Sequence, residues 1–106
     1  MAELPIRETR EEDIDRLFDI RARTRENPVS REQLAAAGIT PASFAAELRS
    51  GNMKGWVCLD GSSPVGFCSA DAAGGEVLVL AVLPEYEGRG VGKRLLAEAV
   101  SWLRSR

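Results

Sequence analysis

A strand, a glycine-rich segment and a helix follow one another directly in the C-terminal third of the chain. Val77 to Leu83 is a continuous apolar run without polar alternation, which predicts a strand buried on both faces of a sheet. Three glycines come next, Gly88, Gly90 and Gly92. From Lys93 to Arg104, apolar residues then recur at the spacing of an amphipathic helix. This order predicts a fold that combines α and β structure.

The beginning of the chain predicts one short strand and a helix. Pro5 to Glu8 can form the strand, and Thr9 with Glu12 has the T-x-x-E spacing of a capping box that begins a helix over about 10–22. Three arginines lie at the end of this helix: Arg21, Arg23 and Arg25. We interpret them as a solvated basic edge rather than a ligand clamp, because acidic residues are interspersed with them.

Two further short helices and a hairpin are expected in the middle of the chain. Ser30 and Gln33 form a second capping box, and Thr40 before Pro41 predicts another helix start. Glycines close these two helices: Gly38 and Gly51. The β-rich segments on either side of a turn predict the hairpin: Gly55–Asp60 and Val65–Ala70.

Composition excludes several classes of function. The 106 residues give room for one domain, residues 1–106. The net charge of -2, from 14 basic and 16 acidic residues, argues against a nucleic-acid partner. No apolar run approaches the roughly 20 residues that span a bilayer, and residues 1–10 do not resemble a signal peptide. We therefore expect neither a nucleic-acid nor a membrane partner.

The chain has no histidine and two cysteines, Cys58 and Cys68. The missing histidine removes Ser-His-Asp and Cys-His catalysis and most zinc sites, so no metal is expected. Both cysteines lie in apolar stretches, where we expect buried reduced thiols rather than a disulfide or a reactive thiol. Reduced thiols favour a cytoplasmic location.

The glycine-rich segment has the composition of an anion site. The first N–H groups of a helix have no intrahelical partner and carry partial positive charge. Arg89, Lys93 and Arg94 add cations there, although cations in a first turn oppose the helix dipole unless an anion binds. The alternative is a tight turn that is glycine-rich without binding anything. Neither a Walker loop nor a Rossmann fingerprint matches, because Glu87 and Lys93 stand where those motifs need glycine.

The segment L-A-V-L-P-E-Y-E-G-R-G-V-G-K-R-L-L, Leu80 to Leu96, resembles the acyl-CoA-binding motif of the GCN5-related N-acetyltransferase (GNAT) family, Q/R-x-x-G-x-G/A. Arg25 to Pro41 is also similar to helix-pair segments of bacterial members. The sequence departs from the motif at Glu87, which occupies the Q/R position. Because backbone amides contribute most to pyrophosphate binding, we expect this departure to weaken binding rather than abolish it.

The resemblance implies acetyl-CoA as co-substrate and two groups of binding residues. The pyrophosphate would be held by Arg89, Gly90, Val91, Gly92, Lys93 and Arg94. The pantetheine arm would pair with the backbone of Leu80, Ala81 and Val82. In the family a bulge opens the slot for the thioester, and an N–H near Val82 would stabilise the oxyanion.

The chemistry implied is acetyl transfer to a primary amine, whose proton needs a base or a water relay. Glu76 is at the position where some relatives have a glutamate base, and the alternative is a solvated glutamate at the start of a strand. Asp71 is a weaker second candidate. Tyr86 does not match the tyrosine that usually protonates the thiolate, and we interpret it as packing at the loop. The acceptor amine cannot be identified from the sequence.

The resemblance also implies the fold class, α+β, as the N-terminal part of an acyl-CoA N-acyltransferase fold. The expected order is β-α-α-β-β-β-α, a mostly antiparallel sheet flanked by helices without the usual C-terminal strands and helix. Val77 to Leu83 would then be an edge strand, which favours a homodimer or other self-association through that edge. Two alternatives remain. One is a non-catalytic acyl-CoA-binding or interaction module completed by dimerisation or a partner, and the other is a remnant with neither activity.

Overall fold

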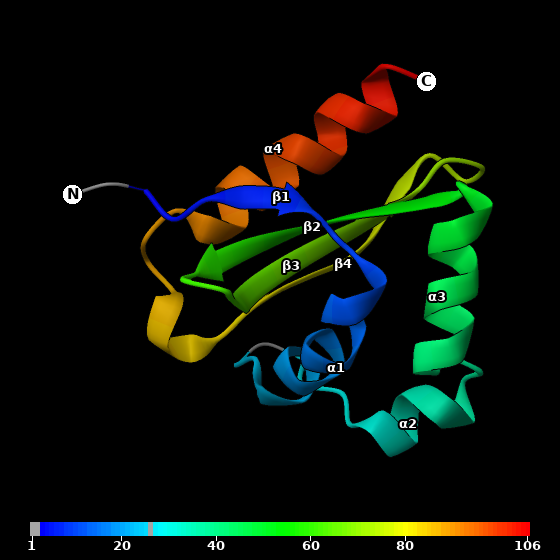
Figure 1. Ribbon diagram of the computed structural model, residues 1–106, viewed down its shortest axis with the longest axis horizontal. Helices are drawn as coiled ribbons and strands as arrows, with labels where there is room; N and C mark the ends of the chain where they lie inside the picture. The colour runs from blue at the N-terminus through cyan, green and yellow to red at the C-terminus, as the bar shows by residue number, and fades with distance from the viewer. Residues whose placement is uncertain (1–2, 26) are drawn as a thin grey trace.

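Four strands form one antiparallel sheet in the order β1-β2-β3-β4. The computed structural model describes residues 3–25 and 27–106. The elements follow the predicted α+β order, with three helices rather than two after the first strand (Figure 1). They are β1 (Ile6–Glu8), the 3-10 helix η1 (Glu11–Asp13), α1 (Ile14–Arg23), α2 (Arg31–Ala36), α3 (Pro41–Ser50), β2 (Met53–Asp60), β3 (Ser63–Asp71), β4 (Glu76–Val82), the 3-10 helix η2 (Pro84–Tyr86) and α4 (Val91–Arg104).

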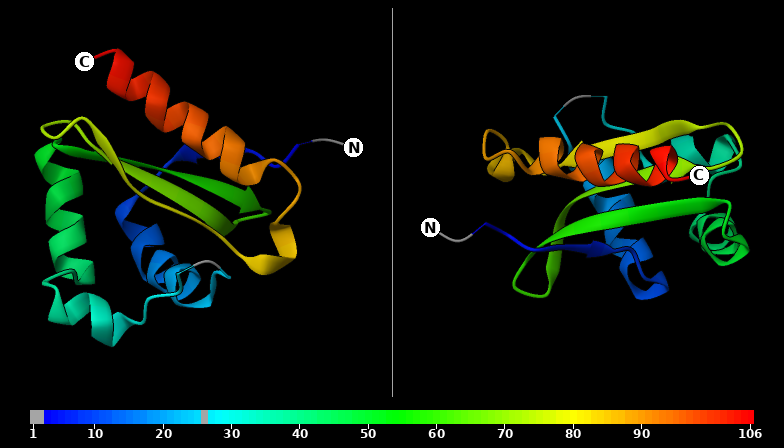
Figure 2. Two further views of the ribbon diagram at one scale, coloured as in Figure 1. Left: turned by 180° about the vertical axis from the view of Figure 1, so that it is seen from behind. Right: turned by 90° about the horizontal axis from the view of Figure 1, so that it is seen from above.

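The alternation of residues along β3 separates the two covered faces of the sheet. A Cβ on Gly66 would lie 3.2 Å from Val91 and 3.3 Å from Leu95, so α4 packs closely on this face. The next residue, Phe67, lines a cavity with Leu17 of α1 on the other face. The sheet therefore lies between α4 and the α1–α3 helices (Figure 2). No helix in residues 3–25 and 27–106 has the length and hydrophobicity needed to cross a membrane.

Aromatic pairs and two thiols belong to the core. Trp56 of β2 meets Trp102 of α4 edge to face, with ring centroids 5.9 Å apart. Phe18 and Phe44 make a similar contact between α1 and α3. The two cysteines are buried and unbridged, which confirms the prediction of free thiols. Burial raises the pKa of the thiol of Cys68 to about 11, so it stays protonated and unreactive near neutral pH.

The predicted capping box at Thr9 and Glu12 was wrong. Thr9 continues the strand pairing instead, because its N–H donates to the carbonyl of Gly55 at 2.8 Å. Asp13 takes the capping role, accepting the N–H of Arg10 at 2.7 Å. The box predicted at Ser30 and the N-cap predicted at Thr40 are present, and the structure shows that Thr40 also forms a reciprocal box with Ser43.

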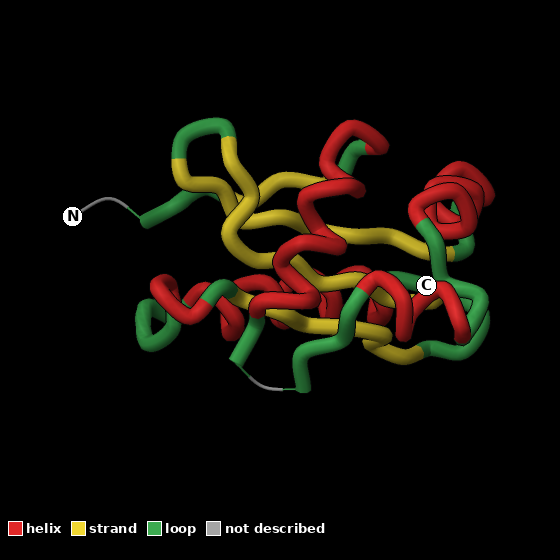
Figure 3. Tube along the Cα trace, turned by 90° about the horizontal axis from the view of Figure 1, so that it is seen from below, coloured by secondary structure: helices red, strands yellow, loops and turns green. Residues whose placement is uncertain are grey.

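The prediction that Val77 to Leu83 is buried on both faces was also wrong. β4 is an edge strand, and Leu78 and Leu80 are 49% and 40% exposed. Its pairing with β3 skips Leu78, because Ser69 pairs with Val79 and Ala70 with Val77. This irregularity is a bulge in the edge strand of the sheet, whose strands are drawn in yellow in Figure 3. The exposure follows from the position of β4 at the edge of the sheet, where an apolar run is only partly covered.

A buried ion pair joins β1 to η1. Arg7 donates two hydrogen bonds to Asp13, at 2.7 Å and 3.0 Å, and the carboxylate is 5% exposed. Burial alone would raise the pKa of Asp13, but the hydrogen bonds from Arg7 and the N–H of Arg10 outweigh it. The pKa of Asp13 is therefore below its ordinary value. This carboxylate contributes stability that is present above its unfolded pKa and is lost as pH falls through its folded pKa.

Asp13→Asn is expected to lower the free energy of unfolding by about 2 kcal/mol at pH 7, because it leaves Arg7 without its charged partner. Urea denaturation measures the loss. The difference from wild type should shrink as pH falls below about 4, since wild type then loses the same charge. Asp15→Asn is the control, because Asp15 pairs with Arg31 while 87% exposed, and it should cost less than about 0.5 kcal/mol. If the difference in free energy of unfolding between wild type and Asp13→Asn stayed constant down to about pH 2, this account would be contradicted.

Candidate functional site

The turn between β4 and α4 reverses the chain on two glycines in left-handed backbone conformation. Gly88 has φ +77° and Gly90 has φ +79°. A Cβ at either position would meet nothing within 4 Å. The conformation, rather than crowding, therefore requires glycine here. Gly90 is the N-cap residue of α4 and supplies no side chain to cap the helix.

The amide groups of this turn are not used by the chain itself. Glu87 donates its N–H to Pro84, and Arg94 donates to Gly90 at 3.0 Å. Between them, no N–H from Gly88 to Lys93 donates to another group within the described residues. Most residues of this turn line a cavity of about 290 Å³, whose walls are Val82, Tyr86, Glu87, Gly88, Gly90, Val91, Gly92 and Lys93. The start of a 14-residue helix adds partial positive charge, so the cavity suits an anion.

Of the three predicted cations, two lie at the turn and one faces away from it. Lys93 lines the cavity, and the guanidinium of Arg89 lies 5.0 Å above the ring of Tyr86. Arg94 instead donates to the carbonyl of Leu4 at 2.7 Å and lies 3.5 Å from Glu3. Both the side chain and the N–H of Arg94 are thus engaged elsewhere, so the geometry gives no support to the prediction that Arg94 binds the coenzyme.

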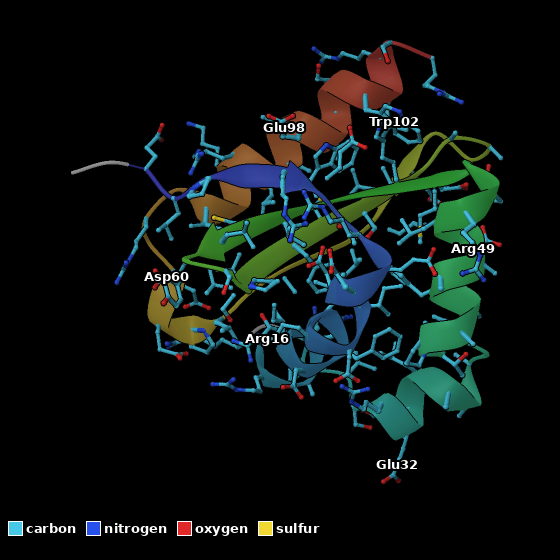
Figure 4. All side chains as sticks on the ribbon, viewed as in Figure 1. Arg16, Glu32, Arg49, Asp60, Glu98 and Trp102 are labelled. Carbon is cyan, nitrogen blue, oxygen red and sulfur yellow. The ribbon has the colours of Figure 1, made fainter. Side chains whose placement is uncertain are left out.

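Tyr86 fixes the turn to the β2–β3 hairpin. Its hydroxyl donates to the carboxylate of Asp60, which lies beside η2 (Figure 4). This hydrogen bond raises the pKa of Tyr86 above its ordinary value. The ring also packs against the hydrophobic core. The structure thus agrees with the interpretation of Tyr86 as a packing residue at the loop.

The predicted pantetheine residues differ in where their backbone groups point. Leu83 donates to Val65 of β3 at 2.9 Å, and Ala81 pairs with Phe67 in the same ladder. Because successive residues of a strand direct their N–H and C=O to opposite sides, Leu80 and Val82 direct theirs to the open edge. Ala81 directs its groups toward β3. The open edge is therefore formed by the N–H and C=O of Leu80 and the N–H of Val82, because the carbonyl of Val82 accepts the hydroxyl of Thr24. This edge ends at the cavity of the turn.

A second and larger cavity, of about 450 Å³, lies between the helices and the sheet. Its walls are mostly apolar, with a few polar and charged side chains, and they include Leu17, Phe18, Arg21, Ser43, Phe44, Glu47, Phe67, Ser69, Asp71, Leu78 and Val79. Because Leu78 and Val79 belong to β4, this cavity and the open edge share one strand. An acceptor molecule in the cavity would therefore reach β4 from the side of α1.

Of the two candidate bases, Asp71 lines this cavity and Glu76 does not. Asp71 accepts hydrogen bonds from Asn52 and from the N–H of Gly74, so it stabilises the β3–β4 turn. Glu76 pairs with Asp71 in the strand register and is exposed at the start of β4. Among the described residues, no three acidic or cysteine side chains gather into a possible metal site.

The sequence did not predict the contacts that three residues at the end of α1 make with this site. Arg23 lies 3.7 Å from Glu85, and Arg25 lies 3.1 Å from Glu87. Thr24, between them, donates its hydroxyl to the carbonyl of Val82 at 3.1 Å. The partners are about sixty residues apart in sequence, so no local pattern signals them. The arginines interpreted as a solvated edge thus include two that are paired with acids of the turn.

The fold and the amide-lined turn define an acyl-CoA N-acyltransferase architecture, and comparison with known proteins agrees. The model of the acetyltransferase (GNAT) family matches residues 14–106, so the chain belongs to the GNAT family. A search of curated proteins gave no match.

Solved structures of acetyltransferases share the fold over nearly the whole chain. The PaiA N-acetyltransferase of Thermoplasma acidophilum, solved with coenzyme A, matches 99% of this chain and 74% of its own, with a TM-score of 0.77 and 21% identity. A GCN5-related N-acetyltransferase from Rhodopseudomonas palustris matches 100% and 69%, with a TM-score of 0.74 and 28% identity. The ribosomal-protein-S18-alanine N-acetyltransferase of Escherichia coli matches 96% and 60%, with a TM-score of 0.71 and 19% identity. The chain therefore spans between 60% and 74% of these proteins.

Proposed function

We propose that this protein binds acetyl-CoA and transfers the acetyl group to a primary amine. The observation that carries the proposal is the row of unengaged amides from Gly88 to Lys93, directly after the open edge of β4. The diphosphate would bind these amides, with Arg89 and Lys93 nearby. The pantetheine arm would pair along the edge with Leu80 and Val82, as an added strand does.

The reaction needs an uncharged amine and a stabilised oxyanion. The N–H of Val82 faces the open edge, where it can donate to the thioester carbonyl as its oxygen gains charge. Glu76 is the proposed base, acting on the amine directly or through water. Glu76→Gln should lower acetyl transfer at least ten-fold while leaving coenzyme affinity unchanged. An unchanged rate would remove Glu76 from this role.

Calorimetric titration with acetyl-CoA tests the binding step, and release of free thiol with a panel of amines tests the transfer. Heat of binding together with thiol release supports the proposal, and the absence of binding would refute it.

A second candidate is a non-catalytic acyl-CoA-binding module. It is favoured by Tyr86, because the hydroxyl of this tyrosine, the one tyrosine in this sequence, is bound to Asp60. Binding without turnover for every amine would favour this module.

We also propose that, without bound coenzyme, β4 mediates self-association as a homodimer paired edge to edge. The edge of β4 is open and carries the exposed side chains of Leu78 and Leu80. Light scattering should give a mass that rises with protein concentration, and Leu80→Lys should shift it to the monomer. Leu96→Lys is the matched control, because Leu96 is 38% exposed and belongs to α4 rather than to β4. A wild-type monomer at millimolar concentration would contradict the proposal.

A further inference from the structure

Three consecutive residues at the C-terminal end of α1 contact the strand end and turn at which coenzyme binding is proposed. We call Arg23, Thr24 and Arg25 the clasp. Thr24 anchors it, since this residue is 7% exposed and its hydroxyl donates to Val82. The two arginines flank this anchor and contact the acids of the turn. The clasp thus holds two guanidinium groups against the segment from Pro84 to Lys93.

The two ion pairs of the clasp have little value for stability. Arg23 and Glu85 are 51% and 59% exposed, and Arg25 and Glu87 are 69% and 37% exposed. Pairs exposed to this extent contribute close to nothing to the free energy of unfolding. The buried Thr24 between them fixes the backbone of this segment, and the ion pairs orient the two guanidinium groups toward the turn.

The clasp changes the charge of the site. Within the segment from Pro84 to Lys93, Glu85 and Glu87 cancel the charges of Arg89 and Lys93. Arg94, which would have added a charge, binds Leu4 and Glu3 instead. The positive charge that a diphosphate requires must then come from the helix start and from the clasp.

Arg25 is the better placed of the two arginines. Glu87 lines the cavity of the turn, and its carboxylate lies 3.1 Å from Nε of Arg25. This contact leaves the terminal Nη groups of Arg25 with no other acceptor among the described residues. An arginine carries four of its five N–H donors on these Nη groups, in a fork that suits phosphate.

We propose that Arg25 is a coenzyme-binding residue, held at the turn cavity by Glu87 so that its Nη groups bind a phosphate of the coenzyme. The inference rests on the proposed function. It assigns Glu87 the role of positioning Arg25. This carboxylate stands at the motif's Q/R position, where it would repel phosphate unless a cation accompanied it. The cation that the motif lacks at position 87 is supplied by Arg25 from across the site.

Calorimetry with coenzyme A tests the proposal on the full chain. Arg25→Gln should weaken binding about ten-fold, because a charge-assisted hydrogen bond is lost. Arg49→Gln is the matched control: Arg49 is 59% exposed, pairs with Glu11 and lies on α3, away from η2 and the turn (Figure 4). The Arg49→Gln variant should bind coenzyme A with the affinity of wild type. Both variants should unfold at the temperature of wild type.

A double-mutant cycle tests the link to Glu87. Glu87→Arg puts a cation at position 87 and repels Arg25, so adding Arg25→Gln should then change affinity less than two-fold. A full ten-fold loss in that background would show that Glu87 does not position Arg25, and would overturn that part of the proposal.

Two probes distinguish the phosphate groups and the failures. Equal losses for coenzyme A and 3′-dephospho-coenzyme A support a contact with the diphosphate, and a loss for coenzyme A alone supports a contact with the 3′-phosphate. If wild type binds coenzyme A and Arg25→Gln binds equally well, this inference is overturned while the proposed function stands. If wild type binds neither probe, the proposed function fails, and the inference fails with it.

Discussion

Gly90→Asp is expected to weaken coenzyme A binding at least ten-fold, with little loss of fold. Gly90 is the N-cap residue of α4 and lines the turn cavity. A carboxylate there would place negative charge and bulk against the diphosphate. Aspartate is among the residues that tolerate left-handed backbone conformation, so we expect the free energy of unfolding to fall by about 1 kcal/mol. Calorimetry and urea denaturation measure the two effects separately.

Gly38→Asp separates backbone strain from loss of the site. Gly38 has φ +84° with nothing within 4 Å of an added Cβ, as Gly90 has φ +79° with the same open surroundings. It lies just after α2, outside the turn. Both variants should lose similar stability, and the Gly90 variant alone should lose affinity. Equal affinity of the two variants would count against the turn as the coenzyme site.

Leu95→Ala is expected to lower the free energy of unfolding by about 3 kcal/mol, the largest stability effect among these predictions. Leu95 is fully buried on the sheet-facing side of α4, where its side chain lies against Gly66. Removing it leaves a cavity between α4 and β3, the contact that fixes the start of α4 above the sheet. Chemical denaturation followed by tryptophan fluorescence measures the change.

Leu96→Ala is the matched control for this prediction. It removes the same atoms from the next residue of α4, which is 38% exposed. Because Leu96 buries less apolar surface than Leu95, its truncation should cost less, below about 1.5 kcal/mol. Similar losses for the two variants would mean that α4 does not pack on the sheet through Leu95.

The unit formed by β4, the turn and α4 was predictable because its signals are local. Glycines at 88 and 90 adopt the backbone conformation that other residues disfavour, and the helical spacing after them places Leu95 toward the core. The helix starts at Ser30 and Thr40 were predictable for the same reason, since the residues that cap each helix lie within four positions of one another.

Features that depend on tertiary contacts could not be predicted. Arg94 has the same local signal as Lys93, but its position on α4 brings it to Leu4 rather than to the turn. The exposure of Leu80 depends on β4 being the edge of the sheet. The apolar pattern of β4 does not indicate this position, which only the family resemblance implied. The contact of Thr24 with Val82 likewise depends on how α1 packs on the sheet.

The central claim is that the amides after β4 bind the diphosphate of the coenzyme. A ¹⁵N–¹H NMR titration of the labelled protein with coenzyme A tests this claim residue by residue. The account predicts that the largest shifts fall on the amides from Arg89 to Lys93 and on Val82. Saturation without shifts at these amides, or shifts confined to α2 and α3, would contradict it.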